Sequence, residues 1–82
     1  MKGYIVIKRE LSLWETAFET KKEAKKYLKK ESKNKNKDYK IIKCKTPQEW
    51  GIFGFAMEAK GNRELANKGI DESIRLMSED NY

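Results

Sequence analysis

Lysine is the residue whose type and spacing most clearly suggest chemistry in this chain, and that chemistry is the binding of anions. From residue 20 onward, four lysines recur at the i, i+4, i+7 and i+11 spacing, which places them in one narrow arc of an α-helix. They are Lys22, Lys26, Lys29 and Lys33, with Lys25, Lys30, Lys35 and Lys37 beside them. Aligned lysines repel each other by a few tenths of a kcal/mol per pair. The pattern therefore favours a surface that an anionic partner stabilises.

The lysines also have a plainer interpretation as a solvated face, in which lysine is the default polar residue of an AT-rich coding sequence. The three arginines all lie outside the lysine-rich segment, at Arg9, Arg63 and Arg75. Recognition of base edges favours bidentate arginine over lysine. If this segment binds nucleic acid, we therefore expect it to bind phosphate with little sequence preference.

Four aromatic residues could add base stacking or apolar contacts to such a surface: Trp14, Tyr39, Trp50 and Phe53. In an extended strand, Trp14 shares one face with Thr16 and Phe18. Exposed rings beside lysines form stacking platforms for single-stranded nucleic acid, and large aromatics dominate protein-binding hot spots. The alternative is that the rings form the core, because a short chain has few other large apolar side chains.

The usual catalytic and metal-binding side chains are scarce. The sequence has no histidine and a single cysteine, Cys44, so neither a Cys–His pair nor an internal disulfide can form within the chain. A zinc site needs about four Cys or His ligands, and no phosphate-binding glycine loop is present. The adjacent carboxylates Asp71/Glu72 and Glu79/Asp80 lie in a solvated helical pattern or near the end of the chain. We therefore expect no enzyme activity, no metal and no cofactor.

Composition places the chain among small globular domains, and we expect one domain over residues 1–82. Hydrophobic residues make up 38% of the chain, and its nine aromatic residues are too many for a disordered protein. The net charge of +6 is concentrated in residues 21–45, which hold twelve lysines and three acidic residues. No apolar run has the length of a membrane span or a signal peptide. With only one cysteine, we expect a cytoplasmic protein that does not enter a membrane.

Three segments favour β-strands. Gly3–Arg9 and Leu13–Phe18 are short runs rich in β-branched and aromatic residues, and Glu10–Ser12 is the expected hairpin connection between them. Tyr39–Lys45 alternates imperfectly around a pair of isoleucines and predicts a third strand.

Two segments carry clear helix signals. Thr20 and Glu23 have the spacing of a capping box, so a helix is expected from there to about residue 31. From Asn62 to about Ser78, one broad side is apolar and the other is charged, which is typical of an amphipathic helix. Its apolar side comprises Leu65, Ala66, Gly69, Ile70, Ile74, Leu76 and Met77.

The segment from Trp50 to Met57 can be interpreted as a helix or as a strand, because its apolar residues follow neither period cleanly. Thr46, Pro47 and Glu49 form a helix-start signal just before it, which favours a largely buried helix. The sequence therefore predicts an α+β fold with the order β-β-α-β-α-α. The simplest arrangement is a three-stranded antiparallel sheet with helices packed on one face.

Two resemblances add to this interpretation. The segment Phe18-Glu-Thr-Lys-Lys-Glu-Ala-Lys-Lys-Tyr-Leu28 resembles the strand-to-helix corner in the arm-DNA-binding domain of phage integrases. The match covers about eleven residues, and the later strand and two helices depart from that domain. In its small size, its lysine-rich and asparagine-rich composition and its lack of catalytic motifs, the chain also resembles small orphan proteins of phages that infect AT-rich Gram-positive bacteria. That resemblance implies an anti-CRISPR or other anti-defence inhibitor acting in the host cytoplasm.

Three functions fit these observations. The first is a non-catalytic accessory protein whose lysines bind and inhibit a host protein or ribonucleoprotein complex. A second is direct, sequence-tolerant binding of the DNA or RNA backbone, with Trp14 or Tyr39 stacking on bases. The third is sequestration of an anionic nucleotide signal by an oligomer.

Overall fold

The computed structural model describes residues 2–8, 10–31 and 39–79, and it confirms the predicted α+β fold. The described elements run in the predicted order of two strands, a helix, a strand and two helices. Their bounds are β1 Tyr4–Lys8, β2 Glu10–Phe18, α1 Lys21–Glu31, β3 Tyr39–Lys43, α2 Pro47–Ala59 and α3 Arg63–Glu79. The ambiguous segment after Pro47 is a helix, as its start signal favoured.

The three strands form one antiparallel sheet in the order β2-β1-β3. The prediction that Glu10–Ser12 connects the hairpin is wrong, because β2 already begins at Glu10. The pairing of β1 with β2 also shifts register: Val6 lies opposite Thr16, but the next residue, Ile7, lies opposite Trp14. Residues directly opposite each other point to the same side of a sheet. Trp14 and Thr16 therefore lie on different faces, which corrects the expectation that they share one.

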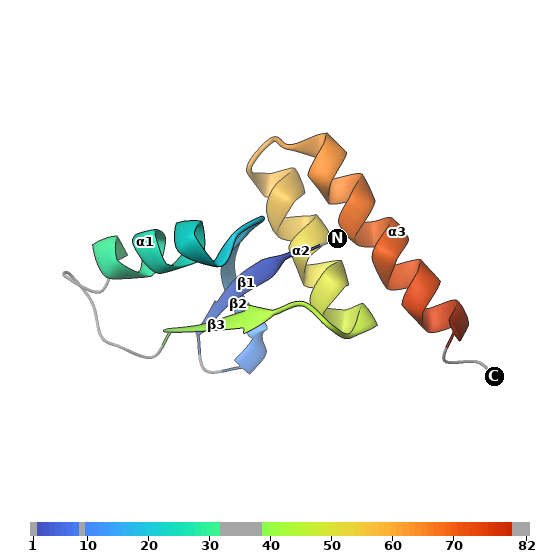
Figure 1. Cartoon of the computed structure of the whole chain (residues 1–82), viewed down its shortest axis with the longest axis horizontal. Helices are drawn as coiled ribbons and strands as arrows, with labels where there is room; N and C mark the ends of the chain where they lie inside the picture. Colours follow the sequence, from blue (N-terminus) through green and yellow to red (C-terminus); the bar gives the residue numbers. More distant parts are fainter. Residues whose placement is uncertain (1, 9, 32–38, 80–82) are drawn as a thin grey trace.

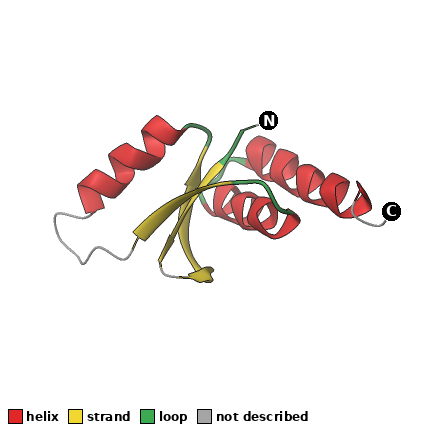
Figure 2. Ribbon diagram, turned by 60° about the horizontal axis from the view of Figure 1, so that its bottom comes forward, coloured by secondary structure: helices red, strands yellow, loops and turns green. Residues whose placement is uncertain are grey.

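Helices cover both faces of the sheet, which corrects the expectation that they pack on one face only. Figures 1 and 2 show α1 on one side of the sheet, α2 on the other, and α3 stacked on the outside of α2. Side chains of the central strand alternate between these sides. Ile5 and Ile7 belong to the core cluster with α2, whereas Val6 lies on the opposite face, under α1, and is also fully buried.

Helix α2 is buried on two sides, which explains why its sequence shows no clean helical period. Its start is fixed by a full capping box: the backbone N–H of Glu49 donates to the Thr46 hydroxyl, and the Glu49 carboxylate accepts from the backbone N–H of Thr46. Trp50 and Phe53 turn toward the sheet and meet edge to face, with ring centroids 5.2 Å apart. At the other end, Gly61 has a positive φ of 84°, a conformation that suits glycine where a helix ends.

The α2–α3 pair is held close by small residues. A Cβ atom built on Gly54 would lie 2.9 Å from Ile70 Cγ1, and one on Gly69 would lie 2.8 Å from Phe53 Cδ1. Only glycine fits at either position without moving its neighbours. The Ser73 hydroxyl, buried in this interface, donates a hydrogen bond of 2.8 Å to the carbonyl oxygen of Pro47. Helix α3 therefore joins the fold through α2.

The single thiol of the chain, Cys44, is buried and should make stability depend on alkaline pH. Burial, reinforced by the negative charge of Glu49, raises the pKa of Cys44 from 9.0 to about 12. Between these values the folded protein keeps a proton that the unfolded chain releases, so stability present below pH 9 is lost as pH rises toward 12. We expect wild type to lose up to about 1.4 kcal/mol per pH unit relative to Cys44→Ala above pH 9. Urea unfolding of both proteins between about pH 8 and about pH 10.5 measures this, and a pH-independent difference would contradict it.

Candidate anion-binding face of helix α1

Helix α1 begins at the predicted cap. The backbone N–H of Glu23 donates to the Thr20 hydroxyl at 3.2 Å, and the hydroxyl in turn donates to the Glu23 carboxylate at 2.9 Å. The first intrahelical bond runs from the Ala24 N–H to the Thr20 carbonyl at 3.2 Å. Since the cap fixes where the helix starts, it also fixes which lysines share a side.

The inner side of α1 uses few residues for packing. Ala24 is fully buried, and Tyr27 and Leu28 are half-buried, as their spacing predicted. The Tyr27 ring lies 5.5 Å from the ring of Phe18 at the end of β2. Figure 1 shows α1 on the side of the sheet that lies away from α2 and α3.

The outer side of α1 is basic. Six lysines of this helix are exposed, and we call them the lysine face: Lys21, Lys22, Lys25, Lys26, Lys29 and Lys30. Five of them were singled out from the sequence, and the structure brings these five together on one helix. The remaining candidates, Lys33, Lys35 and Lys37, lie outside the described residues. The lysine face has the length of the helix, about 16 Å for eleven residues.

Two lysines that the sequence interpretation missed extend the positive charge onto the sheet. Lys8 lies opposite Tyr39, and Lys43 lies opposite Tyr4. By strand alternation both lie on the same face as Val6, the face that α1 covers, and both are exposed. The period-two pattern of each strand was the available signal, but it identifies a shared face only after the strand pairing is known.

The aromatic candidates are divided among three environments. Trp50 and Phe53 are 3% and 0% exposed, so they belong to the core and are not available to a partner. Tyr39 is half-buried and lies on the α1 side of the sheet by register. Trp14 is 37% exposed but lies opposite Ile7, on the α2 side. Tyr39 is therefore the candidate that shares a face with α1.

Lys60 makes tertiary contacts with its ammonium group. Its ammonium group donates to the carbonyl oxygen of Ala17 at 2.7 Å and lies 3.8 Å from the centre of the Phe18 ring. Partial burial lowers its pKa, and the negative charge of Glu23 opposes that shift. This lysine ties the end of α2 to the end of β2, so it is part of the fold rather than of the lysine face.

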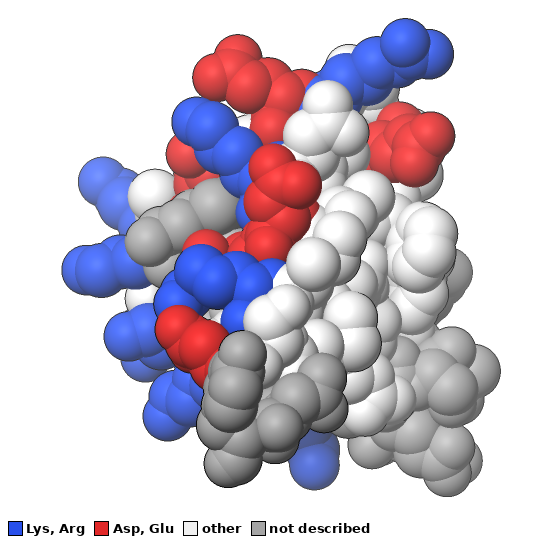
Figure 3. All heavy atoms as spheres, turned by 90° about the vertical axis from the view of Figure 1, so that its right-hand side faces the viewer, with Lys and Arg blue, Asp and Glu red and all other residues white. Residues whose placement is uncertain are grey.

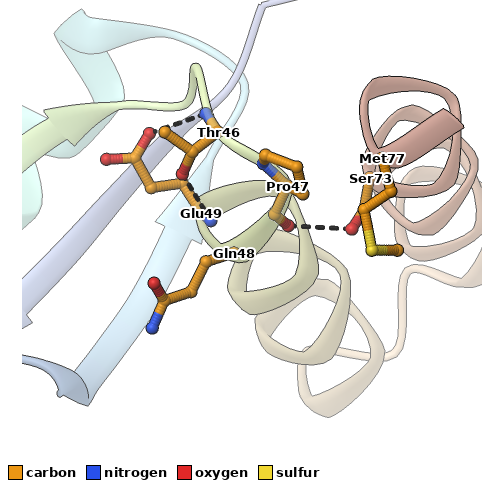
Figure 4. A pocket seen from close by; sticks show the side chains of 6 residues that line it. All are labelled: Thr46, Pro47, Gln48, Glu49, Ser73 and Met77. Carbon is orange, nitrogen blue, oxygen red and sulfur yellow. Dashed lines mark hydrogen bonds between the residues drawn. The ribbon is translucent and has the colours of Figure 1, made fainter. Parts of the chain in front are cut away.

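The part of the chain that the structure describes offers few other kinds of site. Its acidic residues and its cysteine form no group of three or more that could hold a metal ion. None of its helices has the length and apolar character needed to cross a membrane. Its pockets include an open hollow between the start of α2 and the end of α3, shown in Figure 4 and lined by Thr46, Pro47, Gln48, Glu49, Ser73 and Met77.

Comparisons with known proteins found no relative from which a function could be transferred. The chain matches no protein-family model, and it has no significant match among curated proteins or solved structures. Its function must therefore be inferred from the charges, burial and contacts of its own residues.

Proposed function

We propose that this chain is a non-catalytic, cytoplasmic accessory protein of the phage type. It binds and inhibits a host macromolecule, a defence or nucleic-acid-handling complex, through the lysine face of α1. The observation that carries the proposal is that α1 has an apolar side packed on the sheet and a separate, exposed side of lysines. Three apolar side chains attach the helix to the sheet, and its six lysines are exposed.

Electrostatics supports an anionic partner for this face. Six positive charges along about 16 Å of helix create a local positive potential, which steers an anionic surface toward it and is weakened by salt. The two acidic residues of α1 reduce this charge only partly, and the carboxylate of Glu23 is engaged at the cap with Thr20. Lys43 adds to the charge on the same side of the sheet, whereas the formal charge of Lys8 is offset by that of Glu10, the residue opposite it on β2.

Capture of a partner from a host lysate tests the proposal, provided that wild type is compared with a variant that lacks lysines of the lysine face. The bait is the tagged protein, in parallel with a Lys22→Glu/Lys26→Glu variant and a control with the same charge change, Lys45→Glu/Lys68→Glu. We expect one stoichiometric host complex with wild type and the control, and its loss with the α1 variant. A partner captured equally by all three proteins would contradict the proposal.

Direct binding of DNA or RNA is the second candidate, and Lys8, Lys43 and Tyr39 favour it because they extend the basic face with a ring that could stack. Fluorescence anisotropy with labelled duplex and single-stranded oligonucleotides distinguishes the two candidates. A face that makes about four phosphate contacts should give a log–log salt slope of about −4, or roughly a 200-fold loss of affinity from 50 to 200 mM salt. Absence of binding even at low salt would reject this candidate and leave the first.

A further inference from the structure

The flank of the α2–α3 pair that points away from the sheet is apolar and exposed. Phe55 on α2 is 61% exposed, and Ile74 and Met77 on α3 are 53% and 49% exposed. The sequence pattern grouped Ile74 and Met77 with the packed side of α3. In the structure, α2 covers the strip of Ala66, Gly69 and Ser73, so the apolar side of α3 is wider than α2 can cover.

The middle of this flank carries no charge, although 39% of the chain is charged, and the exposed Glu58 and Arg63 lie at its end beside the turn between α2 and α3. At the i, i+3, i+7 spacing of each helix it presents seven uncharged residues, which we call the hairpin face: Gln48, Gly51, Phe55, Asn67, Ile70, Ile74 and Met77. The charged residues of α3 lie on another side, where Lys68 pairs with Glu64 at 3.4 Å. Figure 3 shows the uncharged band, with acidic and basic side chains along one border and at its upper end. Large apolar side chains exposed together, as Phe55, Ile74 and Met77 are, are typical of a surface that contacts another protein.

We propose that the hairpin face pairs with the hairpin face of a second copy of this chain, around a two-fold axis. In such an interface one patch must contain both halves of each contact. The hairpin face does so, because it carries a protruding ring at Phe55 and borders the hollow at Pro47 and Met77 (Figure 4). The eight helical steps from Pro47 to Phe55 span about 12 Å.

The residue midway between ring and hollow permits close approach of two copies. A two-fold axis near Gly51 places the Phe55 ring of each copy over the hollow of the other. A Cβ atom on Gly51 would meet only the Ser73 hydroxyl, at 3.9 Å, so the internal packing of this chain does not require glycine there. The missing side chain instead leaves room for a neighbouring helix.

The distribution of charge is compatible with a second copy as the occupant. A chain of net charge +6 repels its own kind, so self-association needs a contact without charge that lies far from the lysines. The hairpin face meets itself without like-charge pairs, and the sheet and α2 separate it from α1 (Figures 1 and 2). With a Debye length of about 8 Å at physiological salt, the two lysine faces at opposite ends of such a dimer barely repel each other.

The size of the face predicts a weak dimer. Two adjacent helices, each about 20 Å long and about 10 Å wide, present on the order of 400 Å² in projection. Pairing two such faces removes roughly 800–1,000 Å² from water, which is at the small end of specific interfaces. We therefore expect a dissociation constant in the micromolar range.

Sedimentation velocity over a protein concentration range from about 1 to about 500 μM tests the dimer, because this range brackets the expected dissociation constant. The average mass of wild type should rise from one chain toward two. Phe55→Glu and Ile74→Glu should each weaken the dimer at least about 10-fold, whereas Lys68→Glu, on the charged side of α3, should not. Thermal unfolding confirms that each variant remains folded.

A cysteine placed near the proposed axis gives a second, independent readout. Gly51→Cys should form a disulfide between two copies under mild oxidation, because a residue near a two-fold axis lies close to its own symmetry mate. Lys68→Cys serves as the control. A wild-type protein that stays monomeric over the whole series, or equal cross-linking of the two variants, would overturn the proposal.

Discussion

Gly69→Val should destabilise the fold by about 3 kcal/mol, a large part of the total stability of a domain of this size. A Cβ atom at this position would lie 2.8 Å from Phe53 Cδ1, 3.1 Å from the backbone nitrogen of Gly54 and 3.2 Å from the carbonyl oxygen of Trp50. Two of these three atoms belong to the backbone of α2, which cannot yield as a flexible side chain would. The branched side chain of valine must therefore push α3 away from α2. Urea unfolding followed by circular dichroism measures the loss.

Gly51→Ala is the matched control, because it changes another helical glycine of the same pair. A Cβ atom there has only the Ser73 hydroxyl nearby, at 3.9 Å. Alanine favours a helix by about 0.8–1.0 kcal/mol over glycine, so this variant should be slightly more stable than wild type at low-micromolar protein. If both variants lost stability equally, the close contact of α2 with α3 would not be the cause.

The same glycines show how much of the fold could be predicted from the sequence. The helix starts at Thr20 and Thr46 were predictable because a capping box is a local signal, which needs only residues three apart. The stacking of α3 on α2 depends on close approach at Gly54 and Gly69. A single glycine occurs in turns, bulges and helix ends as well as in helix contacts, so it does not reveal a partner helix. The order of layers therefore became clear only from the structure.

Strand pairing limited the prediction of the candidate site in a similar way. The lysines of α1 were found from helical spacing alone, since a helix places residues on a side without reference to its neighbours. Lys43 joins them only through its position opposite Tyr4. Trp14 was wrongly grouped with Thr16 and Phe18 because an irregularity in β2, which no local residue pattern signals, shifts its register relative to Ile7.

Dimerisation through the hairpin face would strengthen the binding of a polyanion by the lysine face. A two-fold dimer would carry two α1 helices at opposite ends, each beyond its own sheet (Figure 1). Two linked sites on one repetitive polyanion bind with an avidity well above that of either site alone. Phe55→Glu should then weaken binding to an extended target without changing the contact that one α1 makes.

Reversing the charge of three lysines on α1 should have the largest effect on binding. In the triple variant Lys22→Glu/Lys26→Glu/Lys29→Glu, we expect at least about a 100-fold loss of affinity for the anionic target at about 50 mM salt. The salt slope on a nucleic-acid target should become shallower by about 3. The stability of the fold should change by no more than about 0.5 kcal/mol, because all three side chains are exposed. The affinity is measured on the target that wild type engages, either the captured host complex or labelled nucleic acid.

A second triple variant separates the lysine face from the overall charge of the chain. Lys2, Lys45 and Lys68 are exposed residues outside α1, and replacing all three by glutamate changes the net charge by the same amount. If binding depends on a local potential at α1, this control should lose only a few-fold in affinity, since distant exposed charges are screened by salt. If both triple variants lost affinity equally, the net charge of the chain would account for binding and α1 would be a solvated face. A loss confined to the α1 variant would assign the contact to the side of α1 that faces away from the sheet.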